Sequence, residues 1–323
     1  MSDRPVPTVW VLTDGKAGDE QPLIGVAAAL GAEPELRRVS PRPAFAFLMP
    51  GGPIDWKDRP SRPGSPLAPP FPDICLATGR RAIAYLRALK KASPETLTVC
   101  FKDPRTQRHG ADLIVAQQHD RLFGKRVMNV ITAPNRIDLE RIAALRDLPP
   151  AELAALPHPR LAVLIGGDSR HHRFTADDIT RLMEGLKARQ AAGAALMITA
   201  SRRTPAALKS ALEALGRLPH VTVWNGTGDN PLLAYLALAD EVIVTADSTN
   251  MLGEAASTGK PLQVFHPSGG HRKIDRFIAA LSEIATVGRF PDAEAKGDYP
   301  PVNTTREIAT AIRRALEDRR NPA

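Results

Sequence analysis

The chain has 323 residues, of which 43% are apolar and 24% charged, as is typical of a soluble globular protein. Its length predicts about two domains, each large enough to bury its own core. It contains no uninterrupted apolar run of the roughly 18 residues that a membrane span needs. The first residues lack a basic leader followed by an apolar region. We therefore expect a cytoplasmic protein, with peripheral attachment to the inner face of the cytoplasmic membrane as a variant of that location.

The formal net charge is +8 at pH 7, and the isoelectric point is near 9.8. Basic and acidic residues are interspersed along the chain rather than gathered in one block, which argues against a nucleic-acid-binding arm. An anionic lipid surface or a phosphorylated ligand suits such a charge. A basic surface that contacts only water is the alternative, because net charge by itself identifies no site.

The cysteines and histidines do not predict a metal site. Cys75 and Cys100 each lie in an apolar, strand-like run, so we expect two buried thiols. His171 and His172 are adjacent and therefore point in different directions. No histidine has the spacing and acidic neighbours of a known ligand set, and we expect neither a metal nor a resident cofactor.

The first half of the chain predicts a parallel sheet with helical connections. Each apolar run ends in a polar or basic cluster, as expected where ligands bind beyond the carboxyl ends of parallel strands. After the first strand, DGKAGDEQ (14–21) is predicted as a glycine-containing turn, followed by a helix over 22–30. The predicted strands of this half cover residues 8–13, 73–78, 97–102, 112–116 and 127–132.

Residues 41–72 contain ten prolines, which exclude a regular helix or a central strand. We expect a surface excursion with a short helical piece over 45–49. Its apolar side chains either contact a membrane or an acceptor, or pack back onto the domain. These residues are Phe45, Phe47, Leu48, Met49, Ile54 and Trp56.

A helix pair over 138–156 and a hinge over 157–159 precede a second strand–helix series. The expected domains are therefore 1–157 and 158–323, and the last helix, 305–319, is able to cross back to the first domain. The predicted fold class is α/β, with two doubly wound Rossmann-like domains facing a central cleft. The strands of the second series are predicted over 161–165, 195–199, 221–224, 242–244 and 262–265, and its helices over 175–191, 205–215, 232–239 and 251–258.

The stretch VIVTADSTNMLGEAASTGKPLQVF (242–265) predicts a strand–helix–strand unit with a polar cluster at its ligand-binding edge. Glu254, one turn into the helix, suits paired sugar hydroxyls because a carboxylate accepts two hydrogen bonds. The alternative is that Ser248 or Thr249 only caps the helix and that Glu254 is a solvated charge. The candidate substrate-binding residues of this unit are Asp247, Ser248, Thr249, Met251 and Glu254.

Two earlier loops of the second domain predict a diphosphate site. The pair Gly166-Gly167 allows close backbone approach to a ligand, and the amides beyond it can hold phosphate oxygens. One arginine of SRRTP (201–205) is suited to bidentate phosphate contact, in place of a metal. The alternatives are a tight turn and a capped helix with solvated arginines. Asp168 and Ser169 either cap a helix or meet a sugar hydroxyl, and Asn225, Gly226 and Gly228 lie in a turn or near a nucleotide base. The remaining candidates are Ser201, Arg202 and Arg203.

The first domain is expected to activate the acceptor. Gly15 and Gly18 form the candidate substrate loop, and Asp14 and Asp19 beside them are the candidate general bases, followed by His119. A base has to lie within hydrogen-bond reach of the acceptor hydroxyl. The alternative for Asp19 is a carboxylate that stabilises the start of a helix.

Taken together, these loops resemble the glycosyltransferase-B architecture, in which the second of two Rossmann-like domains holds most of a nucleotide sugar. More closely, the chain resembles the bacterial branch of the mitochondrial fission Elm family, called Elongated Mitochondria in plants. APNR (133–136) departs from the glycine-led turn expected there. The resemblance rests on LTDGKAGDEQ (12–21), DPR (103–105), QHD (118–120), GGDS (166–169), SRRTP (201–205), NP (230–231), TADSTNMLGEAASTGKP (245–261) and HRKIDRF (271–277).

Two functions follow as hypotheses. The first is a metal-independent glycosyltransferase-like protein that binds a nucleotide-diphosphate sugar and acts on a cell-envelope lipid or glycan acceptor. The second is a non-catalytic protein that recruits partners to an anionic membrane surface through its basic surface and residues 41–72. A shared fold supports many activities. The two hypotheses differ in whether residues such as Arg202 and Glu254 bind a nucleotide.

Overall fold

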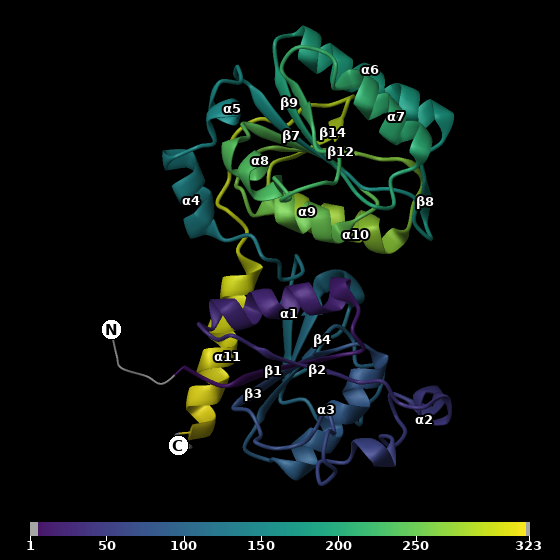
Figure 1. The fold of residues 1–323 in the computed structure, drawn as a ribbon, viewed down its shortest axis with the longest axis vertical. Coiled ribbons are helices and arrows are strands. Elements are labelled where there is room, and N and C mark those ends of the chain that lie inside the picture. The colour runs from purple at the N-terminus through teal and green to yellow at the C-terminus, as the bar shows by residue number, and fades with distance from the viewer. Residues whose placement is uncertain (1–5, 321–323) are drawn as a thin grey trace. The chain divides into compact units, whose positions relative to one another are not determined.

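The computed structural model describes residues 6–320, which divide into two compact units (Figure 1). Unit 1 holds the chain up to residue 136 and again from residue 303, and unit 2 holds residues 137–302. The division differs from the expected boundary after residue 157 because α4 (Leu139–Asp147) packs against α8 (Leu232–Leu238). There the Arg146 Nε donates to the Ala237 carbonyl at 2.9 Å.

Unit 1 is built on a six-stranded parallel sheet with strand order β2-β1-β3-β4-β5-β6. The strands are β1 (Val9–Thr13), β2 (Glu35–Arg38), β3 (Ile74–Thr78), β4 (Leu97–Phe101), β5 (Leu113–Gln117) and β6 (Val127–Val130). The helices are α1 (Ala17–Ala29), α2 (Pro43–Leu48), α3 (Arg80–Ala92) and α11 (Thr304–Arg320), with short 3-10 turns η1 (Trp56–Asp58) and η2 (Gln118–Asp120).

Helices cover both faces of this sheet because successive strand residues point to opposite sides. On β1, Val9 and Val11 pack with the apolar side chains of α1 and α11. Trp10 and Leu12 point the other way, into the core formed with α3 and the 41–72 excursion. All four side chains are buried, so a buried apolar run rather than an alternating pattern marks the strand.

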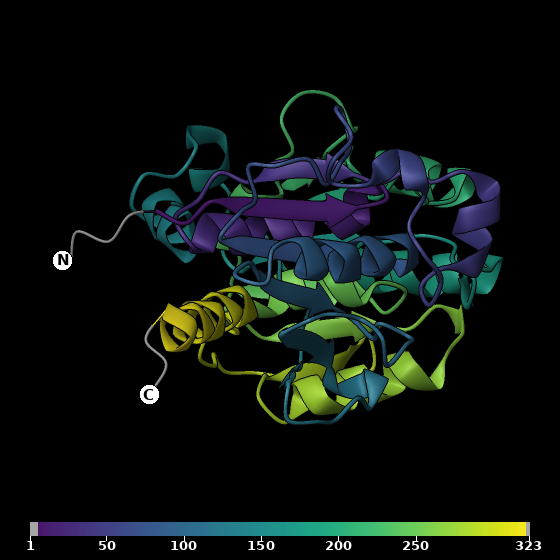
Figure 2. The same ribbon diagram turned by 90° about the horizontal axis from the view of Figure 1, so that it is seen from below.

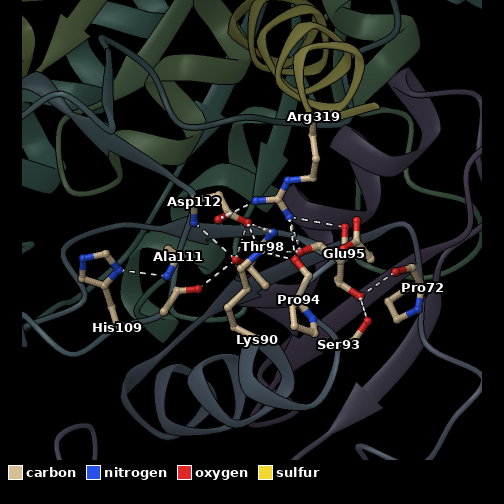
Figure 3. A network of polar contacts seen from close by, with 12 residues as sticks. Pro72, Lys90, Ser93, Pro94, Glu95, Thr98, His109, Ala111, Asp112 and Arg319 are labelled. Atoms are coloured by element: carbon tan, nitrogen blue, oxygen red, sulfur yellow. Dashed lines mark hydrogen bonds and ion pairs between the residues drawn. The ribbon is translucent and has the colours of Figure 1, made fainter. Parts of the chain in front are cut away.

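The last helix returns to unit 1, where it packs in the core and is held by polar contacts near its end. α11 packs against α1, which it crosses at an angle (Figure 1), and buries Ile308 and Ile312 in the core of that face. Near its end, Arg319 pairs with Asp112 at 2.8 Å (Figure 3). Its guanidinium also donates to three successive carbonyls, those of residues 94, 95 and 96. The helix is therefore an integral layer of unit 1.

Unit 2 holds a second six-stranded parallel sheet, with order β10-β9-β7-β11-β12-β14. α6 and α7 supply the core of one face, and α8 and α9 pack against β7 and β11. The strands are β7 (Arg160–Ile165), β9 (Ala195–Ala200), β10 (Val221–Val223), β11 (Glu241–Thr245), β12 (Leu262–Phe265) and β14 (Val287–Phe290), with the small antiparallel pair β8 (His172–Arg173) and β13 (Ser268–Gly269). The remaining helices are α5 (Ala151–Ala154), α6 (Ala176–Ala191), α7 (Ala206–Leu215), α9 (Thr249–Ala256) and α10 (Arg272–Ser282).

The start of α1 corrects one prediction. The helix begins at Ala17 rather than at Pro22, so Gly18 and Asp19 lie in its first turn and not in an open loop. Asp19 and Glu20 are acidic residues near the positive end of the helix, which stabilises this earlier start. Pro22 then lies inside the helix. Gly15 does occupy a turn, with φ of 85°, a conformation that favours glycine.

Residues 41–72 form mostly irregular backbone, with α2 and η1 as their regular pieces, which confirms the expected excursion. α2 and α11 lie toward opposite ends of unit 1 in two perpendicular views (Figures 1 and 2). Within residues 6–320, no helix combines the length and apolar character required to span a bilayer.

Candidate functional site

The glycine pair after β7 packs directly against the residue that follows β11. Gly166 N–H donates to Thr245 Oγ1 at 2.8 Å, and Gly167 N–H donates to Asp247 Oδ2 at 3.0 Å. A Cβ added to Gly166 would lie 2.1 Å from Asp247 Oδ1. Both amide hydrogens are therefore used within the protein, and phosphate contact by the amides that follow the pair stays a prediction. The glycines themselves are required for close packing.

Arg203 and Thr204 complete this cluster. The Arg203 guanidinium pairs with Asp247 at 3.0 Å and donates to the Asp168 carbonyl at 3.0 Å. Thr204 Oγ1 donates to the Gly166 carbonyl. The Asp247 side chain is fully buried and also accepts from Thr245 Oγ1 at 2.7 Å. Arg203 and Asp247 thus join the loops after β7, β9 and β11 through contacts within the protein. Their contact with a substrate stays a prediction.

The residues after the glycine pair stabilise their own loop. Asp168 Oδ1 accepts from Phe174 N–H at 3.0 Å, and Ser169 Oγ accepts from His172 N–H at 3.1 Å. A carboxylate and a hydroxyl used in this way shape the backbone locally. These contacts favour the structural alternative for Asp168 and Ser169 over direct contact with a sugar.

Four predicted residues line one open groove beyond β9 and β10. The groove has a volume of about 690 Å³. Trp224 forms part of its wall, and its indole Nε1 donates to the Thr227 carbonyl at 2.8 Å, which orients the ring. The predicted residues in the lining are Ser201, Arg202, Asn225 and Gly226.

Sequence reasoning missed several residues of this groove. Lys209 and Arg217 add positive charge to its lining, Glu213 adds one negative charge, and Asn230 adds an amide. The available signal was the pair Trp224-Asn225 directly after a short strand, because an aromatic ring beside an amide at a carboxyl edge is a typical base-binding combination. Lys209 and Arg217 gave no signal, since Lys209 lies on α7 and Arg217 just beyond its end, and only the fold brings them to the groove.

Glu254 is a half-buried carboxylate of unit 2. It lies on α9, whose N-cap Ser248 accepts from Met251 N–H at 3.4 Å. In the part of the chain that the structure describes, no side chain or amide donates a hydrogen bond to the Glu254 carboxylate. Burial without a partner raises its pKa to about 7. The cap confirms the structural role predicted for Ser248, while Glu254 retains its capacity to accept hydrogen bonds from a ligand. Thr249 is the first residue of α9.

In unit 1, Asp14 keeps one carboxylate oxygen unpaired within residues 6–320. Its Oδ2 pairs with Lys16 Nζ at 3.0 Å, while its Oδ1 is buried and has no hydrogen-bond partner. The Asp14 side chain is 10% exposed. Its Oδ1 faces the start of α3, since a Cβ added to Gly79 would lie 3.9 Å from it. An unpaired buried acceptor is costly unless a ligand or water satisfies it.

The other two candidate bases are less suitable. Asp19 pairs with Lys102 at 2.7 Å, which ties α1 to the end of β4. The His119 side chain is only 3% exposed and lies 3.9 Å from Asp120, so an acceptor hydroxyl has little access to it. The Asp14 Oδ1 is buried as well, but it has no partner among the described residues, and the role of Asp14 as a general base stays a prediction.

Glu20 is a further polar residue of this edge. It accepts from the Arg38 Nε at 2.8 Å and from Thr13 Oγ1 at 3.0 Å. The hydrogen bond from Arg38 is the largest of the influences that lower its pKa. Glu20 therefore fixes the turn that carries Asp14. Across the described residues, no three His, Cys, Asp or Glu side chains gather in a metal-binding arrangement.

The family model for Mitochondrial fission ELM1 matches residues 17–316 of the chain. The chain belongs to this family. The mitochondrial fission protein ELM1 of Arabidopsis thaliana is 32% identical over 276 residues, which cover 77% of this chain and 65% of the plant protein. The match thus spans less than two thirds of the plant relative. Uncharacterized protein RP120 of Rickettsia prowazekii (strain Madrid E) is 27% identical, with 96% and 98% of the two chains covered.

Solved structures show the fold of this family member. The UDP-GlcNAc 2-epimerase from Neisseria meningitidis, bound to UDP-GlcNAc, superimposes with a TM-score of 0.50 at 12% identity, over 97% of this chain and 93% of that one. A Staphylococcus aureus structure, MnaA with UDP, gives 0.50 at 12% identity, over 96% and 97%. The expected fold class is confirmed: the protein is an α/β chain of two Rossmann-like domains of the glycosyltransferase-B kind.

Proposed function

We propose that this protein binds a nucleoside diphosphate sugar through unit 2 and transfers the sugar to a hydroxyl of a cell-envelope lipid or glycan. The observation that carries the proposal is the groove of about 690 Å³ lined by Arg202, Trp224 and Asn225. Small-molecule sites have volumes of about 300–1,000 Å³. The Neisseria protein of the same fold is described with UDP-GlcNAc bound, which supports a nucleotide sugar as the ligand class.

The groove supplies separate contacts for the parts of a nucleotide. The Trp224 ring offers a stacking surface for the base, and the amides of Asn225 and Asn230 offer both donors and acceptors for its edge. The Arg202 guanidinium is exposed and suits the diphosphate, because its planar donors match phosphate oxygens. This charge stabilises the leaving group as the sugar–phosphate bond breaks.

We assign Glu254 to the ribose hydroxyls from its chemistry, since it lies on α9 and not in the lining of the groove. Its carboxylate accepts two hydrogen bonds when ionised and loses part of that capacity when protonated. Because its pKa is raised to about 7, nucleotide affinity is expected to increase as the pH rises from 6 to 8. The Glu254→Gln variant has no carboxylate at this position, so its nucleotide affinity should not change with pH in that interval.

Asp14 is assigned to the acceptor. Its unpaired Oδ1 accepts the proton of the acceptor hydroxyl as the hydroxyl oxygen forms its bond to the sugar carbon. In the same step the bond from that carbon to the diphosphate oxygen breaks, and the nucleoside diphosphate leaves with the bonding electron pair. The reaction balances without an oxidant or reductant.

The decisive experiment is calorimetric titration of the full chain with UDP, GDP, ADP and their common sugar conjugates. We expect one nucleotide class to bind and the Arg202→Ala variant to lose at least about tenfold in affinity, the loss expected for a charge-assisted phosphate contact. Arg141→Ala is the matched control, since this exposed arginine lies on α4, outside the groove. Absence of binding by every nucleotide, or equal losses in both variants, would overturn the proposal.

A further inference from the structure

Three large apolar side chains stand exposed close together on unit 1. Phe47 and Leu48, at the end of α2, are 83% and 54% exposed, and Trp56, at the start of η1, is 58% exposed. Phe45 connects the two pieces, because its ring meets the Trp56 ring edge-on with centroids 5.6 Å apart. An exposed apolar cluster of this kind is typical of an interaction surface. We call residues 42–62 that carry it the α2–η1 surface.

The backbone beneath these side chains is fixed by two arginines of α3. Arg80 Nη1 donates to the Phe47 carbonyl at 3.4 Å and to the Met49 carbonyl at 2.6 Å. Arg87 donates to the carbonyls of Pro50 and Gly52. Met49, next to the exposed pair, is buried in the core under the excursion. The apolar side chains are thus presented on an ordered support, which reduces the entropy lost on binding.

The charges of the α2–η1 surface are sorted by sign. Its two carboxylates point inward: Asp55 is fully buried against Arg42 at 2.7 Å, and buried Asp58 accepts from the Tyr85 hydroxyl. The Arg42 hydrogen bonds hold the pKa of Asp55 well below its ordinary value. Arg42 neutralises Asp55, and the remaining cations are outside, since Lys57, Arg59 and Arg62 are all exposed. The surface therefore presents apolar groups within a field of positive charge.

We propose that the α2–η1 surface docks on an anionic lipid bilayer, with Phe47, Leu48 and Trp56 entering the headgroup region. Charge complementarity selects this occupant, because a second copy of the same surface would bring like charges together. Aromatic side chains favour the membrane interface, and each nearby Lys or Arg raises partitioning onto an anionic leaflet about fivefold. The inference goes beyond the proposed transfer reaction and does not depend on nucleotide binding.

The test is co-sedimentation of the full chain with vesicles of phosphatidylcholine alone or with 30% phosphatidylglycerol. Binding is expected to the anionic vesicles and to fall at least about tenfold in 0.5 M salt, because salt screens exposed charges. The double variant Phe47→Ser/Leu48→Ser is expected to lose about tenfold or more. Its matched control is Phe123→Ser/Leu148→Ser, whose side chains are 74% and 83% exposed elsewhere on the chain; that control should bind like the unmodified protein.

A second pair of variants tests charge without altering the apolar groups. Arg59→Gln/Arg62→Gln should weaken binding to anionic vesicles about tenfold or more, whereas Arg141→Gln/Lys187→Gln, two exposed cations of unit 2, should change it less than threefold. Equal binding to neutral and anionic vesicles, or equal losses in the test and control pairs, would overturn the inference. Sedimentation velocity supplies a further opposing outcome: a dimer abolished by Phe47→Ser/Leu48→Ser would assign the surface to a second copy.

Discussion

The two sheets each have one place where connections leave neighbouring strands in opposite directions, between β1 and β3 in unit 1 and between β7 and β11 in unit 2. Ligands of such folds bind at this place. In unit 2 this place is filled by the protein itself, because a Cβ added to Gly166 would lie only 2.1 Å from Asp247. In unit 1 this place holds the unpaired Oδ1 of Asp14, and a Cβ added to Gly79 would lie 3.9 Å from that oxygen. The same topology thus forms a closed structural joint in one unit and leaves a buried, unpaired acceptor in the other.

The largest effect is expected from Gly167→Ala, which tests whether the joint in unit 2 is closed. The new Cβ would lie 2.1 Å from the Arg203 carbonyl oxygen, so the backbone has to move, at a cost on the order of 3 kcal/mol of unfolding free energy. Urea denaturation measures the change. Gly18→Ala is the matched control after β1, since nothing lies within 4 Å of its Cβ. Equal destabilisation of both variants would contradict the comparison.

Glu254→Gln should stabilise the protein at pH 8. The pKa of Glu254 is raised from 4.5 to about 7 in the folded protein, so wild-type stability falls as the pH rises through this interval, where the unfolded chain ionises first. Allowing for partial exposure, the gain is about 2 kcal/mol at pH 8, and it disappears near pH 4. Unfolding curves at both pH values measure it. A gain at pH 4 that equals the gain at pH 8 would exclude burial as the cause.

Arg203→Ala separates the two neighbouring arginines. Removing the partner of buried Asp247 should lower the free energy of unfolding by about 1–2 kcal/mol, less than for a fully buried pair because Arg203 is 46% exposed. Arg202→Ala should leave stability within about 0.5 kcal/mol and affect nucleotide binding instead. Thermal unfolding and calorimetric titration of both variants provide the measurements. A loss of stability in Arg202→Ala and a loss of nucleotide binding in Arg203→Ala would contradict this assignment.

The smallest effect on stability is expected for Asp14→Asn. The substitution keeps the shape of the side chain and removes only its exposed pairing with Lys16, so stability should change by less than about 0.5 kcal/mol. Nucleotide affinity should also be retained, while transfer to the acceptor is lost. A loss of stability comparable to that of Gly167→Ala would show that the unit 1 edge is structural as well.

The fold was predictable where apolar runs were rich in β-branched residues, as in Val9–Thr13 and Glu241–Thr245. The strand Glu35–Arg38 was missed because its sequence, ELRR, is polar and lies at a sheet edge. β14 and α10 were missed as well. The motif HRKIDRF contributed to the family resemblance, but no helix was predicted over it.

The candidate site was predictable only in part. Gly166-Gly167 after a strand indicates close backbone approach, and that approach occurs, but the partner is Asp247, 80 residues away from Gly167. A sequence pattern cannot distinguish a ligand from a distant part of the same chain. Asp14 and Arg202 were identified because each directly follows an apolar run. The groove-lining Lys209 and Arg217 depended on how α7 packs, which no local pattern encodes.

The return of α11 has a consequence for protein synthesis. Unit 2 is one uninterrupted segment, whereas unit 1 needs residues 303–320 to complete a core that includes Ile308 and Ile312. Domains generally fold as they leave the ribosome, starting from the amino terminus. Here the unit translated first has to wait for the last residues of the nascent chain, so the middle of the polypeptide is expected to fold before its beginning.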